Sequence, residues 1–300
     1  MKNLCHICNN ETSYLLAKDN FPLFKCSGCG LVYMNPLPQQ NFLNKDIYSA
    51  KSGYQSNKIK DLFKAIPDKK TNDILDFLTK NNIKGRLLDV GCSNGEFLYH
   101  AKKRGFDPYG VELNKRTADI AIQNGLNVFN GLLTDIKYKY DFFDVIFLGD
   151  IIEHVLSPRD FVLECKRILK PQGLIVISTP NLDCLWSKFT FLLNKVLRIP
   201  WSSVTPPYHT FQFSENNLDL LMFQNKFSKV KIWFNRPPRL MYELGSLHLL
   251  KRYRNKKTFL NLFFLLFSSS IYAVSYFFVV GTRLLRRSDF SMVSIYKKNE

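Results

Sequence analysis

The chain has 300 residues, of which 46% are hydrophobic and 22% charged. This length and composition allow one large domain with a small module, or two modest domains, around a packed core. The net charge of +17 indicates anionic surroundings, which could be nucleic acid, an anionic membrane face or phosphorylated substrates. Four of the seven cysteines form two C-x-x-C pairs, and the other three are isolated in the sequence. This odd, irregular distribution argues against a disulfide-bonded secreted protein. Because the first ten residues lack the apolar core of a signal peptide, we expect a cytoplasmic protein.

Residues 1–46 are predicted to form a zinc-ribbon-like module. They contain two C-x-x-C pairs, Cys5 with Cys8 and Cys26 with Cys29, separated by seventeen residues. Each pair can direct two thiolates at one point, and two pairs complete a tetrahedral zinc shell. Four cysteine ligands leave no open position, so the expected zinc is structural. The alternatives are a redox C-x-x-C, which would occur once beside a βαβ unit, and two chance pairs in a disordered tail.

The next segments predict an α/β domain. Residues 47–84 are expected to be a helical lead-in, for example at 73–78, and residues 85–181 alternate between strands and helices. The expected strands are 87–90, 109–111, 126–129, 145–148 and 174–178, and the expected helices are 96–104, 115–123 and 157–169. Gly125 is expected to stop the second of these helices in a left-handed cap. This alternation predicts a parallel, doubly wound, Rossmann-like sheet.

The first strand of this domain leads into a glycine-rich loop, in segment 87–95 (LLDVGCSNG). Gly91 and Gly95 allow a sharp turn and a close approach of a ligand to the backbone, next to the amide donors of a helix N-terminus. Glu112 follows at the end of the second strand, where a carboxylate can accept hydrogen bonds from two ribose hydroxyls. The loop lacks the G-x-G-x-x-G spacing of a dinucleotide site. It does match the G-x-S-x-G elbow of hydrolases, but that interpretation explains neither Asp89 nor Glu112.

The same segment resembles the glycine-rich motif of class I S-adenosylmethionine-dependent methyltransferases. Asp89, Gly91 and Gly95 match that motif, Ser93 replaces its middle glycine, and the resemblance continues through 109–112, 143–146, 150–155 and 169–181. It implies a seven-stranded sheet and S-adenosylmethionine as the cofactor, with Gly91 and Gly95 along its methionine part, Glu112 on its ribose and 131–133 beside its adenine. The cofactor-binding residues that it implies are Asp89, Gly91, Ser93, Gly95, Glu112, Leu133 and Asp150.

Candidate catalytic residues follow the fourth and fifth strands. Methyl transfer mostly requires alignment of donor and nucleophile, with a base where a proton must leave. Glu153 and His154 come after the fourth strand, and His209 lies in an aromatic loop within 182–226, the predicted lid and acceptor region. The alternatives are that Glu153 and His154 only support the cofactor loop, and that His209 is structural.

The C-terminal region, 227–300, is predicted to hold the last two strands, at 230–234 and 292–296, as an antiparallel pair. Between them, 258–282 has no charged residue over twenty-five positions and is flanked by lysines and arginines. A single membrane crossing would separate the two strands, so we expect a helical hairpin or an element embedded in one leaflet. Residues 182–199 have the spacing of a basic amphipathic helix, which could lie on a membrane or cover the active site as a lid.

The zinc module and the methyltransferase-like domain together are similar to bacterial methyltransferases that modify sugars, polysaccharides or glycolipid intermediates. We therefore expect a small-molecule or lipid-linked acceptor, such as a polyprenyl-linked sugar or a quinone precursor. The expected location is the cytoplasmic face of the cell membrane, with anionic lipid as a partner. One alternative is an RNA methyltransferase that binds nucleic acid through its basic surface and zinc ribbon. A second alternative is a regulator that binds S-adenosylmethionine without turnover.

Overall fold

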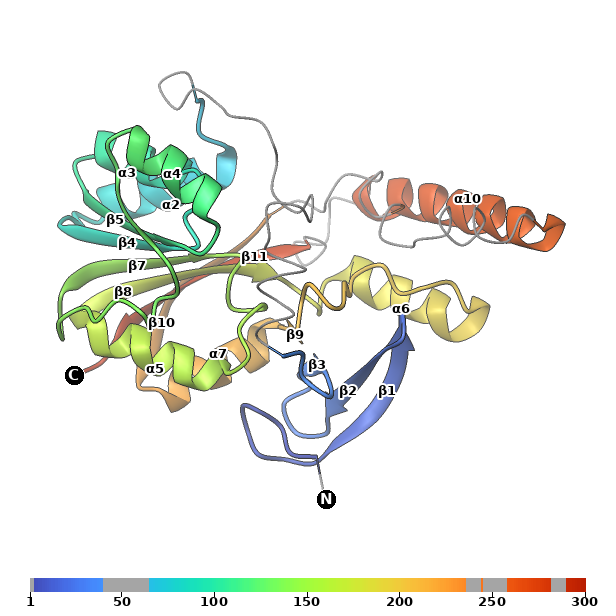
Figure 1. Cartoon of the computed structure of the whole chain (residues 1–300). Coiled ribbons are helices and arrows are strands. Elements are labelled where there is room, and N and C mark those ends of the chain that lie inside the picture. Colours follow the sequence, from blue (N-terminus) through green and yellow to red (C-terminus); the bar gives the residue numbers. More distant parts are fainter. Residues whose placement is uncertain (1–2, 40–64, 236–243, 245–257, 282–289) are drawn as a thin grey trace.

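The computed structural model describes residues 3–39, 65–235, 244, 258–281 and 290–300. Its centre is a seven-stranded sheet (Figure 1). In spatial order the strands are β10 (Phe227–Asn235), β11 (Ser291–Lys298), β8 (Leu169–Pro180), β7 (Phe143–Gly149), β4 (Arg86–Val90), β5 (Asp107–Glu112) and β6 (Asn127–Asn130). The five strands from β8 to β6 are parallel, whereas β11 and β10 are antiparallel. This confirms the doubly wound sheet and its final antiparallel pair.

Helices cover both faces of the sheet. The helices α2 (Lys69–Lys80), α3 (Glu96–Lys103) and α4 (Lys115–Gln123) lie on one face, and α5 (Pro158–Ile168) and α7 (Glu215–Gln224) lie on the other (Figure 1). Because both faces are buried, the central strands are almost continuously apolar. Gly125 follows α4 with φ of +74°, as expected for a left-handed cap. The last parallel strand begins earlier than predicted, since Leu169 already pairs with Phe143.

The N-terminal module packs into the same core. Its sheet contains β1 (Thr12–Lys18), β2 (Phe21–Cys26) and β3 (Val32–Met34), and its fourth strand, β9 (Phe211–Gln212), comes from the region predicted as a lid. Tyr33 stacks on Phe211 with ring centroids 5.9 Å apart. The buried Lys18 ammonium donates to the carbonyls of Trp201 and Val204, at 2.9 and 2.6 Å. The module and the 182–226 region are therefore parts of one packed structure.

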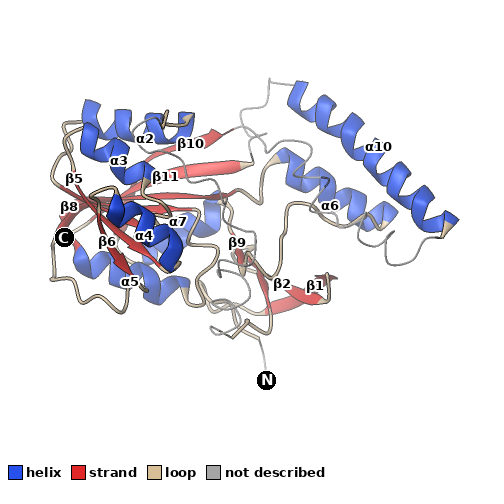
Figure 2. Ribbon diagram, turned by 45° about the horizontal axis from the view of Figure 1, so that its top comes forward, coloured by secondary structure: helices blue, strands red, loops and turns tan. Residues whose placement is uncertain are grey.

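Two further helices, α6 (Leu185–Leu197) and α10 (Phe259–Gly281), pack against each other beside the sheet (Figure 2). The Trp186 ring of α6 makes edge contacts with Tyr272 and Tyr276 of α10, with centroids 5.6 Å apart in both cases. The expectation of a hairpin is wrong, because α10 is continuous and contains no glycine or proline before Gly281 to form a turn. The predicted basic flanks, 251–257 and 283–287, lie outside the described residues. Among the residues that are described, no helix is long and apolar enough to cross a membrane.

Candidate active site

A cavity of about 610 Å³ opens at the carboxyl ends of the parallel strands. It lies where β4 has β5 on one side and β7 on the other, so chain connections leave the sheet in opposite directions. Such a switch point is where open α/β sheets bind ligands. The lining residues come from the ends of β4, β5, β6 and β7 and from the start of α5. Those that the sequence predicted are Gly91, Ser93, Glu112, Leu133, Asp150 and His154.

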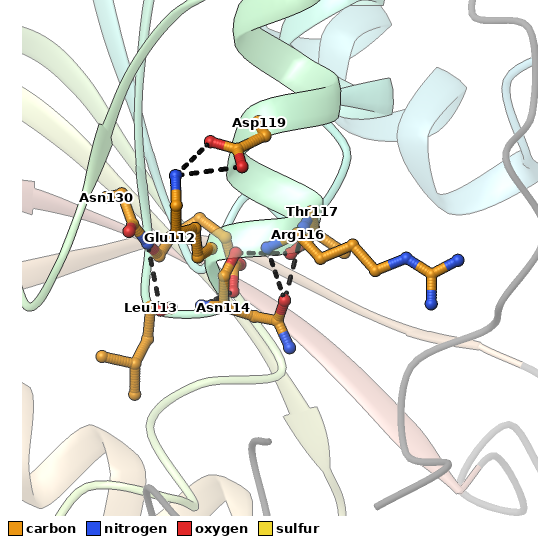
Figure 3. Close-up of polar contacts among 8 residues, drawn as sticks. Glu112, Leu113, Asn114, Arg116, Thr117, Asp119 and Asn130 are labelled. Atoms are coloured by element: carbon orange, nitrogen blue, oxygen red, sulfur yellow. Dashed lines mark hydrogen bonds and ion pairs between the residues drawn. The ribbon is translucent and has the colours of Figure 1, made fainter. Parts of the chain in front are cut away.

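The Glu112 side chain, at the end of β5, holds the glycine-rich loop in place through a hydrogen bond. Its Oε2 accepts from the Ser93 amide at 2.8 Å, and its Oε1 accepts from the Asn114 amide at 2.7 Å. Figure 3 shows this carboxylate beside Asn114, whose side chain caps α4 by accepting from the Arg116 and Thr117 amides. Each carboxylate oxygen has two acceptor sites, so these bonds leave capacity for ligand hydroxyls. The side chain therefore shapes the loop and remains a suitable ribose acceptor.

The two glycines of the loop, Gly91 and Gly95, have different structural roles. Gly91 has φ of +78°, and a Cβ there would lie 2.2 Å from Ile151 Cδ1. Gly91 lines the cavity, so its lack of a side chain permits close approach of a ligand. Gly95 has φ of +83°, and a Cβ there would lie 2.4 Å from Leu126 Cδ1. Since Gly95 is absent from the cavity lining, it serves the packing of α3 against its neighbours.

Asp89, predicted to bind the cofactor, lies behind the cavity wall. It is buried and is not one of the lining residues. Burial, together with the negative charge of Glu112, raises the pKa of Asp89 to about 8. Asp89 therefore stays a predicted cofactor-binding residue that does not itself line the cavity.

Asp150 is held by a lysine that the sequence analysis did not identify. Lys70 on α2 donates to Asp150 Oδ2 at 2.8 Å, and Ser178 Oγ donates to Oδ1, also at 2.8 Å. Desolvation opposes ionisation, but the Lys70 charge and these hydrogen bonds hold the pKa of Asp150 below its ordinary value. Only the tertiary fold joins α2 to this loop, and no local pattern around Lys70 could have indicated the contact.

The three predicted catalytic residues come together, and we call Glu153, His154 and His209 the EHH cluster. Their possible ligand atoms all lie within 4.8 Å of one another. The Glu153 carbonyl accepts from the Thr210 and Phe211 amides, at 2.9 and 3.1 Å, which holds the His209 loop against the loop after β7. Desolvation, and next the Asp150 charge, raise the pKa of Glu153 to about 8, while desolvation lowers the pKa of His209 to about 3. Only His154 of the three lines the cavity.

The outer wall of the cavity is formed by residues that the sequence analysis missed. Val155, Leu156 and Phe161 supply apolar surface, and Asp160 and Glu164 supply carboxylates. Val155 and Leu156 directly follow the predicted catalytic loop, and the other three residues lie in the first two turns of α5. By contrast, no residue of α6 is among those that line this cavity, and the lid role of 182–199 stays a prediction.

The four N-terminal cysteines converge as predicted, and we call them the four-cysteine cluster. Cys5 Sγ lies 3.6 Å from Cys29 Sγ, and Cys8 Sγ lies 3.4 Å from Cys26 Sγ. Sulfur atoms about 2.3 Å from a tetrahedral zinc are roughly 3.8 Å apart, close to these separations. Backbone amides of Gly28 and Cys29 also point at Cys26 Sγ, as donors to a thiolate would. The donor set thus fits a structural metal.

Comparison with known proteins is consistent with this geometry. The ubiquinone biosynthesis O-methyltransferases of Roseobacter denitrificans and Cereibacter sphaeroides are 31% identical over 115 residues and 33% identical over 102 residues. These matches cover 35% and 32% of this chain and 46% and 41% of the relatives, so they span less than half of each relative.

Solved structures that resemble the chain include an S-adenosylmethionine-dependent methyltransferase from Archaeoglobus fulgidus, at 19% identity and a TM-score of 0.47 over 76% of this chain and 94% of that one. The magnesium protoporphyrin IX methyltransferase from Synechocystis, with S-adenosylhomocysteine bound, has 11% identity and a TM-score of 0.49 over 77% and 83%. The sequence profile of a methyltransferase domain matches residues 61–231, more than half of the chain. The chain therefore belongs to the methyltransferase domain family.

Proposed function

We propose that this chain transfers a methyl group from S-adenosylmethionine to an acceptor carried on a lipid. The observation that carries the cofactor assignment is the position of Glu112, which lies at the carboxyl edge of the sheet and lines the cavity beside Gly91. A carboxylate there can accept from both ribose hydroxyls, while the backbone of the glycine loop approaches the ligand closely. The family match over 61–231 supports the same assignment.

The chain's own contribution to such a reaction is alignment. When bound, S-adenosylmethionine supplies a methyl group on an electrophilic sulfonium. The loop after β7, with Asp150 and His154, forms the wall of the cavity next to the glycine loop. Lys70 and Ser178 fix the orientation of Asp150, so this wall is rigid where the reacting groups would meet.

A lipid-linked acceptor is supported by the outer surface of α10. Side chains spaced as one helical face are exposed, with Phe263 at 55%, Val274 at 71% and Phe277 at 69%. An apolar face of this kind on a strongly basic chain is suited to an anionic membrane surface. The curated relatives bear the name of ubiquinone biosynthesis O-methyltransferases, which favours an oxygen nucleophile on a quinone precursor.

Transfer of labelled methyl groups tests the acceptor class. The full chain is incubated with methyl-labelled S-adenosylmethionine and, separately, with membrane lipid extract, nucleotide sugars and total RNA. We expect label in the lipid fraction, at least tenfold above a reaction with heat-inactivated protein. Label in RNA alone would overturn the lipid proposal and favour the alternative of an RNA methyltransferase. Label in none of the three, with S-adenosylmethionine bound, would favour a regulator without turnover.

The membrane proposal predicts that α10 determines binding to vesicles. In the triple variant Phe263→Ser, Val274→Ser, Phe277→Ser, we expect at least tenfold weaker cosedimentation with phosphatidylglycerol vesicles, because each side chain contributes about 1 kcal/mol of burial in lipid. The control replaces Ile122 and Leu163, which are 46% and 44% exposed on α4 and α5, by serine. Unchanged vesicle binding by the triple variant would refute the proposal.

We also propose that the four-cysteine cluster holds one structural zinc ion. The four sulfur atoms form a closed donor set of the kind that zinc prefers, and the cluster is packed into the main core through Cys5 and Cys26. This zinc would have no open position for a substrate. Its role is to fold the N-terminal module against β9 and hence to fix the His209 loop.

A further inference from the structure

Lys18 is a buried lysine of the N-terminal module and lies outside the cavity lining. It is the last residue of β1 and is 5% exposed. A two-residue turn follows it, with positive φ at both Asp19 and Asn20, and pairs it with Phe21 of β2. This is the geometry of a tight hairpin, so the backbone that carries Lys18 has a well-defined position. Because removing an ammonium group from water is costly, a lysine buried in this way requires strong hydrogen-bond acceptors.

The acceptors come from the segment that leads to His209. The Lys18 ammonium donates to the backbone carbonyls of Trp201 and Val204, which are both buried residues. The His209 amide in turn donates to the Thr205 carbonyl at 3.0 Å, so the turn that carries this imidazole begins directly after Val204. Burial, the largest cause, lowers the pKa of His209, and the Lys18 charge contributes to the same shift. A charge from the module therefore acts on this ring.

The other end of residues 201–210 is also held by the module. The Met34 amide of β3 donates to the Thr210 carbonyl at 2.9 Å, and β9, which follows directly, pairs with β3. The two ends of this segment are thus fixed by two different strands of the module. The strand β1 holds one end through the Lys18 side chain, and β3 holds the other end through its backbone.

The middle of the 201–210 segment contacts the wall of the cavity. His154 lines the cavity, and its Nδ1 lies 2.5 Å from the Tyr208 carbonyl oxygen, to which it donates. The rings of His154 and His209 meet edge to face, with centroids 4.9 Å apart. A displacement of the segment would therefore move the His154 ring within the cavity wall.

From these contacts we infer that Lys18 is a positioning residue for methyl transfer, because it holds the 201–210 segment and hence the orientation of His154. The effect on turnover rests on the proposed function. The role requires a long side chain that can donate to two carbonyls at once, which the lysine ammonium does. A methionine would have a similar length but no donor, and would leave the Trp201 and Val204 carbonyls buried without this partner.

The histidine ring signals of the full chain test this role by nuclear magnetic resonance. The chain has five histidines, whose Cε1–Hε1 signals are recorded with ¹³C-labelled histidine and assigned by single replacements with glutamine. In Lys18→Met we expect the signals of His154 and His209 to move. The signal of His6, whose ring contacts β3 and β9 edge to face, should stay in place and show that the module is intact. Lys18→Arg keeps the charge and the donors, so its signals should lie closer to those of the unmodified chain.

The rate of methyl transfer gives a second reading. Transfer of labelled methyl groups to membrane lipid extract should fall by about 100-fold in Lys18→Met, since a displacement of about 1 Å at a reacting site can cost this factor. Lys18→Arg should recover most of this loss. Affinity for S-adenosylmethionine should be unchanged in both variants, because Lys18 lies outside the cavity lining. The control is Lys25→Met, which removes an exposed lysine of β2 in the same module and should change neither the rate nor the histidine signals.

The inference is wrong if folded Lys18→Met has the histidine signals and the transfer rate of the unmodified chain. It is also wrong if the His6 signal moves together with those of His154 and His209 and Lys18→Arg restores none of them, because Lys18 would then serve only to fold the module. If Lys18→Met does not fold, Lys18→Gln is measured by the same criteria, since its amide can still donate to one carbonyl. Absence of label with the unmodified chain would refute the lipid proposal, whereas the histidine signals would still decide whether Lys18 positions the cavity wall.

Discussion

Glu112→Gln is expected to weaken S-adenosylmethionine binding by about 100-fold. Both carboxylate oxygens accept backbone amides, from Ser93 and Asn114, so a glutamine NH₂ in either orientation would face an N–H donor. A buried donor left unsatisfied costs about 1–3 kcal/mol, and bonds from ribose hydroxyls to a charged acceptor contribute about 1.5–3 kcal/mol each. A loss of about 3 kcal/mol corresponds to the stated factor. Isothermal titration calorimetry measures the change directly.

Asp119→Asn is the matched control for Glu112→Gln. Asp119 lies on the same side of the sheet, where its carboxylate pairs with Lys115 at 3.0 Å on the surface of α4 (Figure 3). An exposed pair of this kind contributes little, so cofactor affinity should stay within about twofold. Wild-type affinity in Glu112→Gln would mean that the ligand binds elsewhere, and the assignment of the cavity would fail.

Cys26→Ser is expected to remove the structural zinc and to lower the melting temperature by about 10 °C or more. Structural zinc sites of this type contribute on the order of 10–16 kcal/mol to folding. Cys26 is 2% exposed and belongs to the same core cluster as strands of the main sheet, so the loss would not stay within the module. Even ~4 kcal/mol would produce a shift of this size in a chain of this length. Elemental analysis and a thermal melt give the two readings.

Cys165→Ala provides the comparison for Cys26→Ser. Cys165 is fully buried on α5 but lies outside the four-cysteine cluster, so its replacement removes a core thiol without removing a ligand. The variant should retain one zinc per chain and show a smaller loss of stability. A structural metal at the cluster would be contradicted if the Cys26→Ser protein kept its zinc. It would also be contradicted if the Cys26→Ser and Cys165→Ala proteins had the same melting temperature.

The amino-acid sequence alone was sufficient to predict the Rossmann-like sheet and the place of the glycine-rich loop in it. Short apolar runs located the parallel strands, because strands buried on both faces are continuously apolar. The spacing from Gly91 to Glu112 follows from the loop after β4, one helix and the next strand. The two C-x-x-C pairs also predicted that the four sulfur atoms lie together, since each pair directs its two sulfur atoms at one point. These features depend on contacts between segments that are close in sequence or have a fixed topology.

The part of the site around Asp150, Glu153 and His209 depends on tertiary packing. Lys70 reaches Asp150 from α2, and β9 joins the N-terminal sheet, which brings His209 against Glu153. The sequence analysis also predicted Asp89 and Gly95 as cofactor-binding residues, and tertiary packing leaves both outside the lining of the cavity. One cause is common to all of these cases. Contacts between distant segments depend on how whole elements pack, and no local pattern of residues encodes that packing.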